Sequence, residues 1–144
     1  MRKLLIIASA FLLLTGCRKD EDELTSNELT GNWKLFKVAV LDGKTSKELL
    51  SEAISCGGEI EFLKKNQVKM TEVDPETCER IDTTTGTYTY TPATKILVFT
   101  DENDSEEYLV RKKNTREMEL ENVEGYDFNS DGTDDKLVVY FKNL

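Results

Sequence analysis

The segment LTGNWKLFKV, Leu29–Val38, carries the strongest secondary-structure signal in the chain, and the pattern continues through AVL to residue 41. Aromatic and β-branched side chains are frequent in it, and such residues favour a pleated, half-buried strand. Gly31 precedes the aromatic residues and gives the segment a defined start. The segment therefore predicts a long first β-strand over 31–41.

Further segments alternate apolar and polar residues with the period of two that is typical of strands. Ile60 and Phe62 lie on one face of such a segment, and Glu59 and Glu61 lie on the other. With the first strand, eight strands are expected, at 31–41, 58–64, 68–70, 85–92, 96–99, 108–110, 118–120 and 137–141. Most connections are short enough for antiparallel hairpins, so the sequence predicts an all-β domain.

A single short helix is expected between the first two of these strands. Its sequence signals are a capping box, Thr45 to Glu48, and one apolar face made of Leu49, Leu50, Ala53 and Ile54. Two interpretations of this helix are open: it is a plug that completes the core, or it is a lid over a pocket.

Gly31 and Trp33 resemble the G-x-W signature that opens the first strand of lipocalins, and especially of the lipocalin-like domains of bacterial surface lipoproteins. The resemblance implies an eight-stranded antiparallel up-and-down barrel over 28–144, with Trp33 closing its base. The alternative is that Trp33 is a core tryptophan on an unrelated β-strand.

The barrel interior has two interpretations. In one, aromatic side chains form the wall or mouth of a pocket for a small apolar or amphipathic ligand. In the other, they fill the interior, and the domain serves as a structural or interaction module. The residues concerned are Trp33, Phe36, Phe62, Tyr88, Tyr90, Phe99, Tyr108 and Phe141.

The first 16 residues are typical of a secretory signal, with Arg2 and Lys3 before an apolar run over 4–14. The alternative is a short membrane anchor, although the run is shorter than the about 20 apolar residues that a membrane-spanning helix needs. The residues Leu14 to Cys17 resemble the lipobox of bacterial lipoproteins. That resemblance implies cleavage before Cys17 and attachment of lipid to its sulfur.

Residues 17–27 are expected to form a flexible acidic tether, because so polar a segment cannot bury enough apolar surface to fold. Arg18 and Lys19 followed by acidic residues at 20–23 resemble a lipoprotein export signal of Gram-negative bacteria. The resemblance implies an outer-membrane lipoprotein exposed on the cell surface. The alternative is a lipoprotein that faces the periplasm.

Charge and composition limit the chemistry. The chain has a net charge of −9, and without Arg2 and Lys3 of the signal it has −11, which argues against nucleic-acid binding. Histidine is absent, so Ser-His-Asp and Cys-His catalytic arrangements are excluded. We expect no catalytic residue and no organic cofactor; a carboxylate-based hydrolase is a distant third hypothesis after an interaction module and a ligand carrier.

Two cysteines remain once Cys17 carries lipid. In an oxidising compartment Cys56 and Cys78 form the one possible pair, so a disulfide between them is predicted. The alternative is a pair of redox-active thiols, but a C-x-x-C spacing is lacking.

The segment DFNSDGTDD, 127–135, has the spacing of a calcium loop. Its candidate ligands are Asp127, Asn129, Asp131, the carbonyl of Thr133 and Asp135, and Gly132 stands at the sharp bend. Position 12 is Val138 instead of glutamate, and the segment resembles the loops of FG-GAP-type propeller blades more than an EF-hand. The predicted role of Ca²⁺ is structural; the alternative is an acidic hairpin loop whose carboxylates face water.

Overall fold

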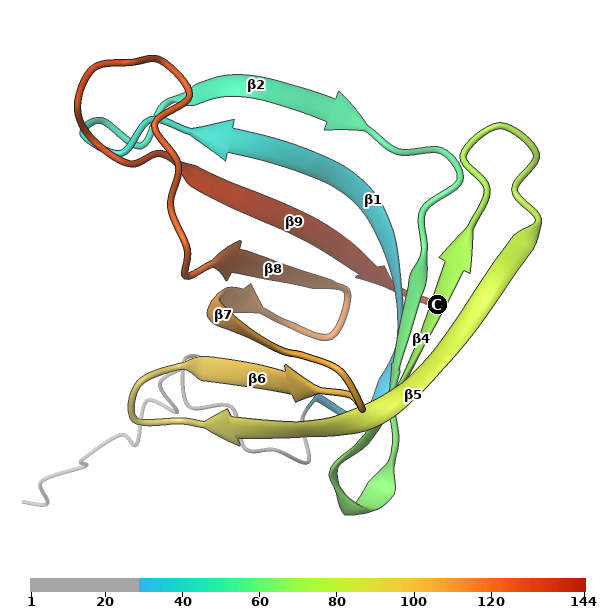
Figure 1. Ribbon diagram of the computed structural model, residues 1–144. Helices are drawn as coiled ribbons and strands as arrows, with labels where there is room; N and C mark the ends of the chain where they lie inside the picture. The colour runs from blue at the N-terminus through green and yellow to red at the C-terminus, as the bar shows by residue number, and fades with distance from the viewer. Residues whose placement is uncertain (1–28) are drawn as a thin grey trace, which may run out of the picture.

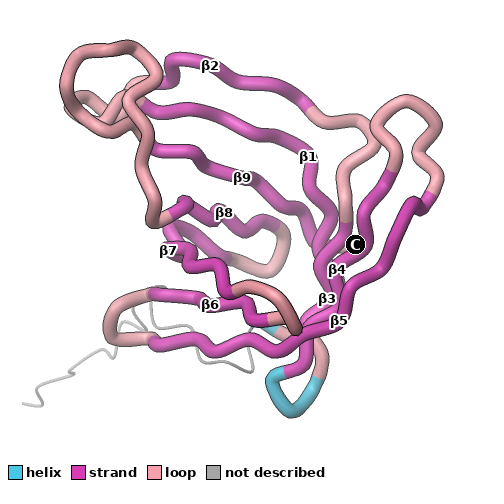
Figure 2. Tube along the Cα trace, in the orientation of Figure 1, coloured by secondary structure: helices cyan, strands magenta, loops and turns pink. Residues whose placement is uncertain are grey.

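The computed structural model describes residues 29–144, which fold into an all-β structure (Figure 1). Strands make up most of this part of the chain, and helix is limited to short turns such as η2 (Lys64–Asn66) (Figure 2). The strands are β1 (Gly31–Leu41), β2 (Glu48–Ala53), β3 (Glu59–Phe62), β4 (Gln67–Val73), β5 (Arg80–Thr91), β6 (Ile96–Thr100), β7 (Ser105–Lys113), β8 (Glu117–Asn122) and β9 (Lys136–Asn143).

Eight of the strands close into an antiparallel barrel, as predicted. From β3 to β9 each strand pairs with its neighbours in sequence, and β1 pairs with both β3 and β9 and so closes the ring. The β1–β9 register shifts between Leu35 and Lys37, so that Phe36 forms a bulge. Such a bulge bends a strand and allows a sheet to curve on itself.

The predicted helix over 45–54 is wrong, because Glu48–Ala53 is the strand β2, paired with the second half of β1. The residues before Glu48 in the expected capping box belong to the tight β1–β2 turn instead. The carboxylate of Asp42 accepts hydrogen bonds from the backbone N–H of Lys44 and Thr45, and Ser46 has a positive φ of 57°. Pairing with β1 overrides the local helical pattern. Because the helix is absent from this segment, the plug and lid interpretations of it are also wrong.

The core occupies the half of the barrel in which β1 begins. Trp33, Phe62, Leu97 and Met118 are each at most 1% exposed. The buried cluster consists of Leu29, Trp33, Phe62, Val68, Tyr88, Leu97, Phe99, Val110, Met118, Leu120 and Phe141. We call this half the closed end.

The sheet divides toward the opposite end, which we call the open end. The β3–β4 pairing stops at Glu59 and Thr71, whereas β4 and β5 continue as a hairpin to Val73 and Arg80. Strand β2 pairs with β1 at this end, and among the described residues it pairs with no other strand. The open end therefore has an unpaired sheet edge along β2.

Candidate functional site

Trp33 closes one end of the barrel together with groups from two other segments. Its indole Nε1 donates a hydrogen bond to the carbonyl of Leu29 at 3.2 Å, and Lys113 Nζ lies 5.4 Å from the centre of its ring. The ammonium comes from the end of β7 and makes a cation–π contact. These contacts fix the start of β1 against the opposite wall of the barrel.

The predicted pocket residues pack largely against one another. Phe62 contacts Tyr88 edge to face at 4.9 Å between ring centroids, and it stacks on Phe99 at 5.8 Å. Phe99 in turn contacts Tyr108 at 5.7 Å. Such aromatic pairs stabilise a core beyond the area that they bury, so these rings fill the space between strands β3 and β7.

The remaining predicted pocket residues divide between two places. Phe141 is buried in the same cluster, and Tyr90 packs against it. Phe36, on the bulge of β1, contacts Tyr140 at 6.4 Å instead. Phe62 also borders a surface depression beside Leu63 and Gln67.

Tyr108 marks the boundary between the aromatic core and a polar open end. Burial raises the pKa of its hydroxyl, and the hydrogen bond that it donates to Glu106 Oε2 at 2.8 Å raises the pKa further. Glu106 lies opposite Phe99 in the β6–β7 pairing, so it is on the inner face of the barrel. A carboxylate therefore lies beside the aromatic core, next to Phe99 and Tyr108.

Other inward positions at the open end are also acidic. Glu72 follows the core residue Met70 by two positions and lies opposite Asp82, and Glu52 lies opposite Val38. Side chains two residues apart on a strand share a face, so these carboxylates belong to the inner face. Among the described side chains, the register places no lysine or arginine on this half of the inner face; the inward lysine, Lys113, is at the closed end.

Asp135 joins two of the loops at the open end. Its carboxylate is 1% exposed and accepts hydrogen bonds from the backbone N–H of Gly43 at 3.0 Å, Phe128 at 2.9 Å and Asn129 at 3.3 Å. A Cβ at Gly43 would collide with the backbone carbonyl of Asp134, so a residue without a side chain is needed there. The long β8–β9 connection is thereby held against the β1–β2 turn.

The predicted calcium ligands lie in this β8–β9 connection, and their oxygens accept hydrogen bonds from the loop itself. Asp127 accepts from the N–H of Asp131 and Gly132, at 3.1 and 2.9 Å. Lys44 Nζ lies 2.9 Å from Asp131 Oδ2. No group of three or more Asp, Glu, Cys or His residues within 29–144 has the arrangement of a metal site, and calcium binding stays a prediction.

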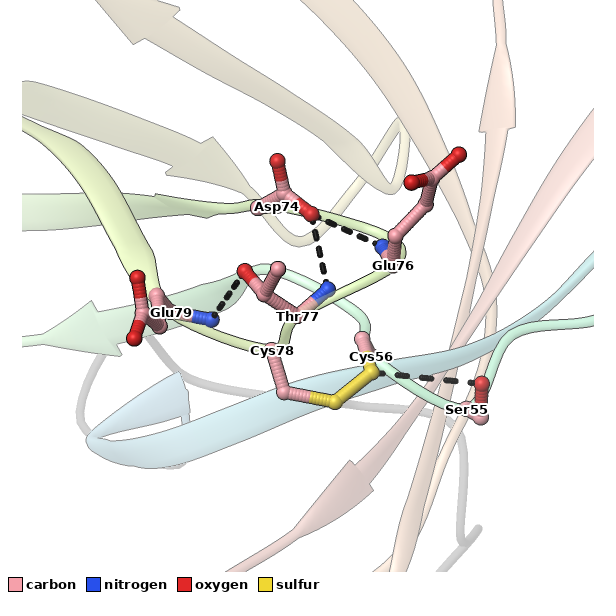
Figure 3. Close-up of a disulfide and its surroundings, with 7 residues drawn as sticks. All are labelled: Ser55, Cys56, Asp74, Glu76, Thr77, Cys78 and Glu79. Atoms are coloured by element: carbon pink, nitrogen blue, oxygen red, sulfur yellow. Dashed lines mark hydrogen bonds between the residues drawn. A yellow bond between two sulfur atoms is a disulfide. The ribbon is translucent and has the colours of Figure 1, made fainter.

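The predicted disulfide is present (Figure 3). Cys56 and Cys78 are bonded, with their Cα atoms 4.9 Å apart, and Cys56 is buried. Asp74 shapes the turn that presents Cys78 by accepting hydrogen bonds from the N–H of Glu76 and Thr77, both at 2.8 Å. The bond ties the β4–β5 hairpin to the link between β2 and β3.

The sequence-predicted groups before residue 29 lie outside the described residues. They are the signal segment 1–16, the lipidation site Cys17 and the tether 17–27. No helix within the described residues is long and apolar enough to cross a membrane.

Sequence reasoning missed Lys44, Lys113 and the strand β2. Both lysines act through partners that are distant in sequence; Lys44 and Asp131, for example, are 87 residues apart. A lysine in a turn or at a strand end carries no local signal of such a partner.

No protein-family model matches the chain, and a search of curated proteins finds no match.

Proposed function

We propose that this chain is a lipid-anchored cell-envelope protein whose barrel acts as a structural and interaction module. The observation that carries the proposal is the mutual packing of Phe62, Tyr88, Phe99 and Tyr108. An eight-stranded barrel is only wide enough to be filled by its side chains or to hold one small ligand. Rings that are already in contact favour the first of these arrangements.

The same proposal places the domain among lipocalin-like proteins of bacterial surfaces. Its support is the position of Gly31 and Trp33 at the start of β1 in a closed barrel, with Lys113 over the indole. Lipocalins place a basic residue from the last strand over this tryptophan, whereas Lys113 comes from β7. The contact is similar, and the strand that supplies it differs.

The proposed module acts without catalysis and is held at the outer membrane by lipid on Cys17. The absence of histidine excludes histidine-based catalysis, and the acidic charge of the mature chain disfavours nucleic acid as a partner. Several acyl chains anchor a protein stably, because each buried methylene contributes about 0.8 kcal/mol.

Protease treatment of intact cells tests the location. The wild-type protein should be lipidated and digested from outside, and Cys17→Ala should leave unlipidated precursor or release soluble protein. Changing Asp20, Glu21 and Asp22 together to Ala should give a protein that is lipidated but protected. Protection of the wild-type protein would contradict surface exposure, and absence of lipid on Cys17 would contradict the anchor.

A further inference from the structure

Strand β2 presents an unpaired row of backbone hydrogen-bonding groups. Ile54, the residue that follows β2, donates its N–H to the carbonyl of Phe36 in β1 at 2.8 Å. Because alternate residues of an antiparallel strand bond to the same neighbour, the N–H and C=O groups of Ser51 and Ala53 point away from β1. In Figure 1, β2 forms the outer edge of the sheet, with no described strand beyond it.

The edge lacks several of the devices that keep sheet edges from pairing, although it carries the inward-pointing Glu52 and a register shift against β1. Proteins protect such edges with lysine, proline or a covering segment, but β2 contains neither residue, and all six of its positions are exposed. Leu50 is 64% exposed and borders a depression of about 230 Å³ together with Val38 and Val40. A strand added here would gain apolar contacts as well as hydrogen bonds.

The inner face near this edge selects for positive charge. Glu52 is on the inner face of β2, and Glu72, Asp82 and Glu106 are on the inner faces of other strands at the open end. No described lysine or arginine shares that half of the inner face. Basic side chains on the inner face of an added strand would find carboxylates there.

The same charges disfavour two other occupants of the edge. The chain's own tether is acidic at positions 20–23. A second copy would bring another Glu52 to the edge, on a chain that already carries −11 without its signal. Like charges brought together in this way oppose association.

We infer that β2 accepts an extended, basic segment of a partner protein as an additional strand of the sheet. Backbone hydrogen bonds supply affinity in this mode of recognition, and alternate side chains supply specificity. The segment carries lysine or arginine at every second position, directed toward the inner face. The inference rests on the proposed function, since it names the class of partner that the module binds.

Fluorescence anisotropy with the lipid-free mature chain tests the inference. The probe is a labelled heptapeptide of alternating lysine and valine, and its matched control has glutamate in place of lysine. The basic peptide should bind and the acidic one should not. A basic peptide with N-methyl groups along one backbone edge should bind about tenfold more weakly or worse, because it cannot complete the ladder.

Two variants with matched controls locate the binding. Ser51→Pro removes an outward N–H and keeps the pairing with β1, whereas Ser51→Val keeps the N–H. Glu52→Lys reverses an inward charge, and Glu107→Lys makes the same change of net charge on the outer face of β7. Ser51→Pro and Glu52→Lys should each weaken binding about tenfold, and their controls should not.

The outcomes separate this inference from the proposed function. Absent binding, equal binding of both peptides, or binding that survives Ser51→Pro overturns the inference. If Ser51→Pro does not fold, the binding measured with Glu52→Lys and with the N-methylated peptide decides whether the inference holds. A dimer of the wild-type protein that Ser51→Pro abolishes assigns the edge to a second copy and also overturns the inference. A small molecule held inside the barrel overturns the proposed function instead and leaves the peptide result unaffected.

Discussion

Lys44 and Asp131 are the clearest example of single residues that organise the open end. The Lys44 ammonium contacts both the carboxylate and the backbone carbonyl of Asp131, at 2.9 and 3.2 Å. The hydrogen bond from Lys44 lowers the pKa of Asp131, and the same bond raises the pKa of Lys44. One ion pair thus links the β1–β2 turn to the β8–β9 connection.

This ion pair predicts a loss of stability in acid. The folded-state pKa of Asp131 lies below its ordinary value of 3.8, so its contribution is complete above that value and is lost as the pH falls through the folded pKa. Lys44→Met should therefore reduce the fall in melting temperature between neutral pH and pH below 3.8. Lys47→Met, in the same turn, is the control; equal acid sensitivity in all three proteins would contradict the assignment.

The predicted calcium loop gives a second test at this scale. If Ca²⁺ binds, its affinity should be weak, on the order of 10⁻⁴–10⁻³ M, because position 12 lacks a glutamate. Lys44→Met should tighten binding, since the ammonium no longer competes for Asp131. Calorimetry should show a calcium-dependent rise in melting temperature that Asp127→Ala abolishes. An unchanged transition at millimolar calcium would exclude a structural ion.

At the scale of elements, β2 shows where local sequence patterns fail. The residues ELLSEA are good helix formers, and the capping box before them is a genuine local signal. Their pairing with Lys37–Leu41 decides the outcome, and that information lies in β1. By contrast, the alternation of Ile60 with Glu61, or of Tyr88 with Thr89, predicts strands because each face has one environment in the fold.

The disulfide belongs to the same scale, because it joins a hairpin to a link between strands. It spans 22 residues of sequence, and closing a loop of this length stabilises by about 3 kcal/mol on the chain-entropy model. Cys56→Ser should lower the melting temperature, and the Cys56→Ser, Cys78→Ser double variant should behave alike. The far-ultraviolet strand signal should persist at low temperature in both. Free thiols in the native protein, found by quantitative labelling, would contradict the bond.

At the scale of the whole molecule, the barrel could be predicted but its open end could not. Strand alternation and the G-x-W segment at Gly31 and Trp33 predicted the closed ring that the structure has. The buried carboxylate of Asp135, by contrast, holds loops that are 92 residues apart through Gly43. Contacts between residues so far apart produce no periodic pattern in a sequence. The acidic inner face and the unpaired edge therefore could not be predicted without the fold.

A matched pair of variants tests whether aromatic side chains fill the barrel interior. Phe62 is 1% exposed, and Phe62→Ala should cost about 3–5 kcal/mol and leave a cavity. Phe36→Ala, at the bulge of β1, should cost less, because that side chain lies outside the buried cluster. Urea unfolding of the two variants measures the difference, and equal costs would contradict the placement of these rings.

Titration of the lipid-free mature protein with a fluorescent fatty acid shows whether the barrel interior is filled. A lipocalin with an open interior serves as the positive control for the probe. We expect no saturable binding to the wild-type protein, because Phe62, Tyr88, Phe99 and Tyr108 already occupy the interior. Saturable binding at one site per chain, competed by unlabelled fatty acid, would contradict a filled interior and identify the barrel as a ligand carrier.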